Sequence, residues 1–170
     1  MERGFIQGKL EIKFLLLYIL GRAESPLSLD ALTDVALCDD GVTYFDFSVA
    51  LSELVDTQHV LLERGQYSLT EKGRRNGAIT ADQVPYSVRM KCDVRMGQIN
   101  AQLRRERRIR SELAEREEGG WRVKLALDGE EEPERFQLAV TVPLQEDGLK
   151  LIARFRADPE GFVREITGIQ

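Results

Sequence analysis

The first half of the chain carries its apolar residues at helical spacing. Residues 9–21 contain the apolar run 14–20 and end at Gly21, which predicts a buried helix with a glycine at its C-terminus. Ser28 and Thr43 each precede a segment in which apolar residues recur every three or four positions. Because a hydroxyl oxygen can accept a hydrogen bond from the first turn of a helix, both residues are predicted N-caps.

The pattern changes from helical to extended after the third predicted helix. HVLLER and QYSLT are short extended segments, and Arg64-Gly65 between them predicts a tight β-hairpin. Thr70 is the predicted N-cap of the short helix TEKGRRNG that follows. Helix, helix, turn, helix and hairpin is the element order of a winged helix-turn-helix domain, which we expect over residues 1–80.

Residues 81–170 are expected to form a second, α+β domain with a role in assembly or sensing. A helix is predicted from Tyr86 to about Gln102, because its apolar residues recur at intervals of three or four. Residues 121–127 and 136–142 alternate between apolar and polar side chains, which predicts two strands.

Two segments of this second half fit both a helix and a strand. Helix propensity favours a helix over residues 104–118, but apolar residues alternate within this segment and a sheet of two strands is marginal. We therefore favour a strand over about 106–117. Residues 149–156 also fit either element. A last short helix is predicted after Asp158, its N-cap, with Pro159 at the first helical position.

Several stretches of the chain resemble a known family. They are KLEIKFLLLYIL, YFDFSVALSELVDTQHVLLE and YSLTEKGR, which resemble winged-helix proteins related to the PadR and MarR groups of bacterial regulators. Through VTVPLQEDGLKLIARFRADPEGFVREI, the chain is similar over almost its full length to small bacterial winged-helix proteins whose C-terminal half is a domain of unknown function. YSLTEKG is shared by many winged helices and indicates fold rather than partner.

The resemblance implies a three-stranded antiparallel meander in the second half and favours a helix over residues 149–156. The expected fold class is therefore α+β. An N-terminal winged helix-turn-helix is followed by a helix, the three-stranded antiparallel meander and C-terminal helices.

Composition and charge exclude several classes of protein. The 170 residues are 42% hydrophobic and 31% charged, which is typical of a globular protein and not of a disordered tail, a collagen or a disulfide scaffold. The longest apolar run, residues 14–20, is far shorter than the roughly 20 residues of a membrane span. The N-terminus also lacks the order of a signal peptide. We expect a cytoplasmic protein without a membrane partner.

Candidate catalytic and metal-binding residues are scarce. The chain has two cysteines, Cys38 and Cys92, and a single histidine, His59. These are too few residues to make a zinc site or a Cys–His nucleophile a strong candidate. We expect two reduced thiols, a structural or surface role for His59, and neither metal nor cofactor. Glu130-Glu131-Glu132 is expected in a solvated turn rather than in a carboxylate site. Without a phosphate-binding loop or a Ser–His pair, we do not expect an enzyme.

In a winged helix, the third helix enters the major groove of DNA and the hairpin, or wing, lies along the backbone or in the minor groove. Tyr44, Ser48 and Ser52 on the third helix offer hydrogen bonds or an aromatic ring to base edges. Cations lie at the tip of the wing and at the start of the next helix. The expected DNA-binding residues are Thr43, Tyr44, Ser48, Ser52, Arg64, Lys72, Arg74 and Arg75.

Net charge opposes this expectation. Residues 1–78 contain eight basic and twelve acidic side chains, a balance of −4. The third helix carries Asp46, Glu53 and Asp56 and no Lys or Arg, although phosphate neutralisation supplies most non-specific affinity for DNA. The alternative is a winged-helix module that binds another protein and not DNA.

The densest positive segment lies in the second half, at residues 104–110, where five arginines would be divided between the two faces of a strand. We interpret this segment as a solvated strand or a surface for an acidic partner. The leading hypothesis is a dimeric transcriptional regulator without a cofactor, which binds double-stranded DNA, pairs through the helix over residues 86–103, and responds to a small-molecule effector whose identity the residues do not indicate.

Overall fold

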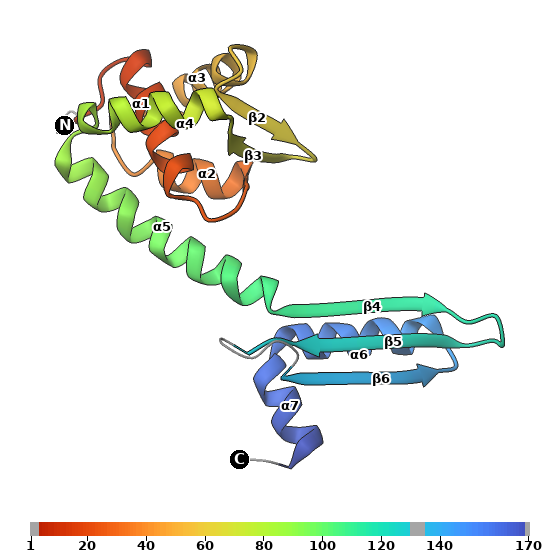
Figure 1. Ribbon diagram of the computed structural model, residues 1–170. Coiled ribbons are helices and arrows are strands. Elements are labelled where there is room, and N and C mark those ends of the chain that lie inside the picture. The colour runs from red at the N-terminus through yellow and green to blue at the C-terminus, as the bar shows by residue number, and fades with distance from the viewer. Residues whose placement is uncertain (1–3, 130–134, 169–170) are drawn as a thin grey trace. The chain divides into compact units, whose positions relative to one another are not determined.

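Figure 1 shows the computed structural model of the protein, which describes residues 4–129 and 135–168. Over these residues it is an α+β protein with seven α-helices and two three-stranded antiparallel sheets, so the predicted class is confirmed. The predicted turn at Glu130-Glu131-Glu132 lies outside the described residues. The chain divides into two compact units, Met1–Leu103 and Arg104–Gln170.

The N-terminal unit is built from helices and one small sheet. The strands of this sheet follow the order β1-β3-β2, and the two-residue strand β1 is an element that the apolar pattern did not predict. In chain order the elements are α1 (Lys9–Arg22), β1 (Leu27–Ser28), α2 (Leu29–Ala36), α3 (Tyr44–Asp56), β2 (Val60–Glu63), β3 (Gln66–Leu69), α4 (Glu71–Thr80), a 3₁₀ turn (Ala81–Gln83) and α5 (Tyr86–Arg107), which continues past the boundary of the unit.

The predicted caps and hairpin of this unit are confirmed. The hydroxyls of Ser28, Thr43 and Thr70 accept hydrogen bonds of 3.1–3.2 Å from backbone N–H groups in the first turns of α2, α3 and α4. Arg64 and Gly65 have φ angles of +51° and +77°, the left-handed pair that a two-residue hairpin turn requires. The sequence pattern therefore predicted the hydrogen bonds and turns that depend only on neighbouring residues.

Helix α1 is the centre of the N-terminal core. Seven of its side chains are buried, as the apolar segment predicts. The helix continues through Gly21 to Arg22, one residue beyond the predicted end. Its last turn is closed by Asn100 of α5, whose amide donates to the Arg22 carbonyl at 2.9 Å and accepts from the Glu24 N–H at 3.1 Å. A buried side chain from a distant helix therefore satisfies the backbone groups that a glycine C-cap was expected to satisfy.

Helix α5 packs against the N-terminal core, and this sets the boundary between the units. Val88, Cys92 and Met96 are buried among residues of α1 and its neighbours, and Ile99 and Leu103 pack against the same core. The units therefore divide after Leu103, not after residue 80 as predicted. The apolar stripe that we expected to pair two copies of the chain is used inside one copy.

The C-terminal unit is an antiparallel sheet with helices on one face (Figure 1). Its strands follow the order β4-β5-β6, and Leu125 in the central strand lies opposite Ser111 and Leu138. Gly119 and Gly120 at the first turn have φ angles of +87° and +78°. The elements are β4 (Ile109–Glu115), β5 (Trp121–Leu127), β6 (Phe136–Val142), α6 (Gln145–Ala157) and α7 (Pro159–Thr167).

Both ambiguous segments are now assigned. Residues 104–118 contain the end of α5 and then β4, so the predicted strand exists but begins at Ile109 rather than at about residue 106. Residues 149–156 are helical. Asp158 caps α7, accepting from the Gly161 N–H at 2.9 Å, as predicted.

Three aromatic rings hold the helices of this unit to its sheet. Phe136 of β6 lies 6.2 Å from Phe155 of α6 and 6.4 Å from Phe162 of α7 between ring centroids, and the two helical rings are 5.3 Å apart. Phe155 is fully buried. Rings at these separations, mostly edge to face, add to the free energy that their buried area already supplies.

Replacing Phe155 with alanine is expected to lower the free energy of unfolding of the C-terminal unit by about 3–5 kcal/mol, because a cavity replaces a buried ring. Trp121 on β5 is the single tryptophan of the chain, so its fluorescence during urea unfolding reports on this unit. Leu149→Ala on the exposed side of α6 is the control, with an expected change within about 0.5 kcal/mol. Equal losses in the two variants would contradict the assigned core.

Candidate nucleic-acid interface

Helix α3 divides into a buried face and an outer face. Phe47, Ala50, Leu51 and Leu54 are buried in the N-terminal core. Tyr44 and Ser52 are exposed and Ser48 is half-buried. The predicted base-reading side chains are therefore on the part of α3 that a ligand can reach.

Two of the predicted hydroxyls, at the N-cap of α3 and on the helix itself, are already engaged within the chain. The Thr43 hydroxyl accepts from the Asp46 N–H at 3.1 Å and donates to Oδ2 of Asp46 at 2.6 Å, so it serves as a cap and has no proton left for a base. The Ser48 hydroxyl donates to the Tyr44 carbonyl at 2.8 Å and retains only its acceptor capacity. Ser52 and the Tyr44 ring remain the side chains with the most freedom to contact a partner.

The four predicted cations differ in their surroundings. Arg64 is exposed at the turn of the β2–β3 hairpin, and Arg74 is exposed on α4. The Arg75 guanidinium lies 3.8 Å from the carboxylate of Glu71, with both side chains more than 70% exposed. The Lys72 ammonium donates to the Thr57 carbonyl at 2.8 Å, at the C-terminal end of α3. Lys72 therefore connects the start of α4 to α3 in addition to carrying charge.

His59 and Gly73 form the close contact between the segment after α3 and the start of α4. The Thr70 N–H donates to the His59 carbonyl at 3.1 Å, and a Cβ atom at Gly73 would lie 2.0 Å from the same carbonyl oxygen. Nδ1 of His59 lies 2.9 Å from the Thr57 hydroxyl and Nε2 lies 2.7 Å from the Asn76 amide nitrogen. Because the amide donates to Nε2, a neutral ring protonated at Nδ1 satisfies both contacts.

The electrostatics of His59 agree with this assignment. Burial lowers its pKa, and the charges of Lys72 and Lys13 lower it further. A neutral imidazole that is bonded at both nitrogens has a structural role, in keeping with the role expected for this residue.

Glu53 on α3 is neutralised by two lysines of α1. The Lys13 ammonium lies 2.6 Å from one carboxylate oxygen and the Lys9 ammonium contacts the other. These contacts lower the pKa of Glu53. Sequence reasoning treated Glu53 as an uncompensated negative charge, and no local pattern connects it with lysines 40 and more positions away. Asp46 and Asp56 remain exposed on the same helix.

Large apolar side chains are also exposed beside this surface, and sequence reasoning did not single them out. Phe45, next to Tyr44 at the start of α3, is 74% exposed. Leu61 and Leu62 on β2 are each more than 40% exposed. The surface formed by α3 and the hairpin is therefore mixed in character, with hydroxyls, cations and apolar groups.

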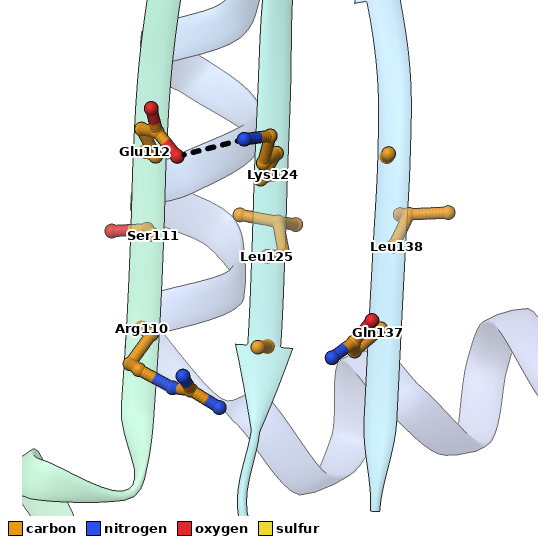
Figure 2. Close-up of a pocket in the computed structure, with 9 residues that line it drawn as sticks. Arg110, Ser111, Glu112, Lys124, Leu125, Gln137 and Leu138 are labelled. Carbon is orange, nitrogen blue, oxygen red and sulfur yellow. Dashed lines mark hydrogen bonds and ion pairs between the residues drawn. The ribbon is translucent and has the colours of Figure 1, made fainter. Parts of the chain in front are cut away.

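The C-terminal unit has a shallow depression on the face of its sheet that the helices leave open. The depression has a volume of about 460 Å³. Figure 2 shows the side chains that line it. Glu112 and Lys124 pair across neighbouring strands at 3.2 Å, and Arg110 donates to the Asp128 carboxylate at 2.8 Å. The opposite face of the sheet, which the helices cover, is filled by the apolar core of this unit.

The arginine-rich segment is not one continuous patch on a strand. Arg104, Arg105 and Arg107 lie in the last turn of α5, and only Arg110 lies on β4. The Arg108 side chain donates to the Asp128 carbonyl at 2.7 Å. The expectation that these arginines are divided between the two faces of one strand is wrong, because α5 continues to Arg107 and β4 begins only at Ile109.

Across the described parts of the chain, no group of three His, Cys, Asp or Glu residues could hold a metal ion. None of the helices in those parts is both long and apolar enough to cross a membrane.

The comparisons with known proteins identify a family without a described activity. A family model described as "Domain of unknown function (DUF4364)" matches residues 12–168. No curated protein and no solved structure gives a significant match. The match includes residues of both units.

Proposed function

Since the chain belongs to the DUF4364 family, a domain of unknown function, its activity has to be inferred from its own surface, and we propose that it is a dimeric DNA-binding transcriptional regulator of the winged-helix type. The proposed interface consists of the outer face of α3, the β2–β3 hairpin and the start of α4.

The order of elements supports this proposal. Three helices are followed by a hairpin, and a short strand before α2 completes the sheet β1-β3-β2. In winged helices the last helix before the hairpin carries the base-reading side chains, a position that α3 occupies here. The resemblance of the first half to PadR- and MarR-related regulators points to the same use of this helix.

The observation that carries the proposal is the link between α3 and the cations of α4. Lys72 donates to the carbonyl of Thr57 directly after α3, and Thr70 is bonded to the adjoining His59 carbonyl. These bonds place the start of α4, and with it Lys72, next to the end of α3, and Arg74 and Arg75 follow on the same helix. A helix without a cation of its own thereby gains positive charge at one end for phosphate contacts.

The dimer is proposed to form through the outer side of α5. Tyr86, Met90 and Val94 recur at intervals of four and are 46–70% exposed, so they form a stripe on the side of α5 that the core does not use. A second copy of the chain is the expected partner, since operators commonly mirror two-fold proteins. Light scattering at micromolar concentration should return twice the 19.3 kDa of the chain, and a monomer mass would contradict the dimer.

The test of the proposed function is duplex binding by the full chain as a function of salt. We expect the logarithm of the affinity to fall linearly with the logarithm of the salt concentration, with a slope of about 0.9 per phosphate contact. Genome-wide capture of DNA with the tagged protein should retrieve a limited set of duplex sites. Absence of duplex binding even at low salt would overturn the proposal.

Glu53→Gln is expected to tighten non-specific duplex binding and to steepen its salt dependence. The substitution releases Lys9 and Lys13 from their carboxylate partner, so up to two more phosphate contacts can form, a slope change of at most about 1.8. Asp56→Asn on the same helix is the matched control, because it removes one charge without releasing a paired lysine. The expectation fails if the two variants have the same effect in a fluorescence-anisotropy salt titration.

A protein-binding module is the second candidate function, and the exposed apolar groups favour it. Phe45, Leu61 and Leu62 resemble the anchors of a protein interface more than phosphate-binding groups. The same capture experiment separates the candidates, because a protein-binding module retrieves no duplex DNA at low salt.

A further inference from the structure

The two cysteines of the chain meet in the fold although they are 54 positions apart. Cys38 lies in the turn after α2 and Cys92 lies on α5, with their sulfur atoms 3.6 Å apart in a thiol–thiol hydrogen bond. Cys38 is half-buried, whereas Cys92 is fully buried. One sulfur is therefore within reach of a small solute and the other is covered.

We propose that Cys38 and Cys92 form a peroxide-oxidisable dithiol site, in which Cys38 is the sulfur that reacts and Cys92 is the sulfur that closes an internal disulfide. This inference concerns both cysteines of the N-terminal unit and does not depend on DNA binding.

The charges around Cys38 favour its reactive form. Lys91 on α5 donates to the Cys38 carbonyl at 3.4 Å, and Arg95, one turn further, contacts the Asp34 carbonyl on α2. The hydrogen bond from Cys92 lowers the pKa of Cys38 to about 7, Arg95 and Lys91 add to the effect, and burial and Asp39 oppose it. Cys38 therefore forms its thiolate at a lower pH than an ordinary cysteine, and the thiolate is the nucleophile.

Cys92 has the opposite character. Its hydrogen bond to Cys38 and its burial raise its pKa, Asp93 raises it further, and Arg95 opposes this. A buried, protonated thiol does not react with a solute directly. The Cys92 thiol lies instead against the sulfur of Cys38, with which it would form the disulfide. This arrangement is typical of redox-sensing cysteines with a resolving partner.

The reaction balances with hydrogen peroxide as the oxidant. The Cys38 thiolate attacks one peroxide oxygen, the O–O bond breaks, and the second oxygen leaves as hydroxide and becomes water. The resulting sulfenic acid is then attacked by the sulfur of Cys92. The S–S bond forms, the S–O bond breaks, and the hydroxyl group leaves as water with the proton of Cys92. The two thiols lose two electrons and two protons, and the peroxide is reduced to two water molecules.

The geometry requires only a small local movement. A disulfide bond is about 2.05 Å long, so the sulfur atoms must approach by about 1.5 Å. Cys38 follows the end of α2 at Ala36 and is not held in a helix, so its side chain and the turn can supply most of this movement. The bond would connect α5 to the turn that precedes α3.

The experiment treats the reduced full-length protein with a small molar excess of hydrogen peroxide and measures intact mass, free thiols under denaturing conditions, and cysteine-containing peptides. We expect the loss of two hydrogens, the loss of both free thiols, and a Cys38–Cys92 peptide within one chain. Thiols that stay free, a mass gain of oxygen alone, or a disulfide between chains on a non-reducing gel would each overturn the proposal.

Two variants test the assigned roles. In Cys92→Ser, oxidised Cys38 has no partner in the chain and should be trapped by dimedone, whereas Cys38→Ser should leave Cys92 unreactive. Lys91→Gln should move the pH midpoint of Cys38 alkylation upward, and circular dichroism checks that the variants are folded. Faster alkylation of Cys92 than of Cys38 in the wild-type protein would contradict the roles without reference to any variant.

Discussion

Reversing Arg74 and Arg75 to glutamate together is expected to abolish duplex binding by the full-length protein. Helix α3 has no Lys or Arg, so phosphate contacts in the proposed interface must come from the hairpin and from α4. Each lost contact lowers the slope of log affinity against log salt by about 0.9, and each introduced carboxylate repels a phosphate in addition. Both arginines are exposed, so we expect the fold to persist.

The control is a double reversal with the same change of net charge elsewhere. Arg122 on β5 and Arg164 on α7 are exposed in the C-terminal unit, outside the proposed interface. Arg122→Glu with Arg164→Glu should retain most of the binding, apart from a general weakening by the added negative charge. Equal losses of duplex affinity in the two double variants, or unchanged binding after reversal of Arg74 and Arg75, would contradict the proposed interface.

The second large effect is expected from a single methyl group. In Gly73→Ala, the new Cβ would lie 2.0 Å from the His59 carbonyl oxygen, a backbone atom that cannot turn away. Helix α4 and the start of the hairpin must then separate, which also strains the Thr70 N–H bond to the same carbonyl. We expect a loss of about 3 kcal/mol or more in the free energy of unfolding.

Gly77→Ala on the same helix is the matched control for this prediction. Its Cβ would meet Leu17 atoms no closer than 3.4 Å, and alanine is the better helix former by about 1 kcal/mol. Urea unfolding followed by far-ultraviolet circular dichroism should separate the two variants clearly. If the Gly73→Ala protein were as stable as the Gly77→Ala protein, the contact between α4 and the His59 carbonyl would be shown to adjust with little loss in the free energy of unfolding.

Helix starts and turns were the part of the structure best predicted from sequence. Ser28, Thr43, Thr70 and Asp158 cap the helices that they were expected to cap. Each cap bond joins residues three positions apart, so its donor and acceptor are already close in the chain. Arg64-Gly65 is predictable for the same reason, since the hairpin turn is decided by the φ angles that its own residues adopt.

Helix ends were predicted less well because distant residues decide them. Gly21 was expected to end α1, but Asn100 satisfies the backbone groups there from 76 and 78 positions away. The apolar stripe of α5 was recognised, but the sequence pattern does not say which surface it covers. It covers the N-terminal core, and this moves the boundary between the units to Leu103.

The candidate site divides in the same way. The pattern alone placed Tyr44, Ser48 and Ser52 on one helix and the cations at a hairpin and a helix start, because helical and strand periods assign faces directly. Their arrangement was not predictable. The structure shows that Lys72 bonds to the end of α3 and that Thr43 uses its hydroxyl as a cap.

The sequence by itself therefore determined the α+β class, the periodic faces and the caps, all of which depend on residues within about one helical turn or one hairpin. Only the tertiary structure decided that Glu53 is neutralised by lysines of α1 and that Cys38 meets Cys92. The physical reason is chain separation. Contacts between residues tens of positions apart form only when whole elements pack, and the packing follows the shape and volume of all the buried side chains together.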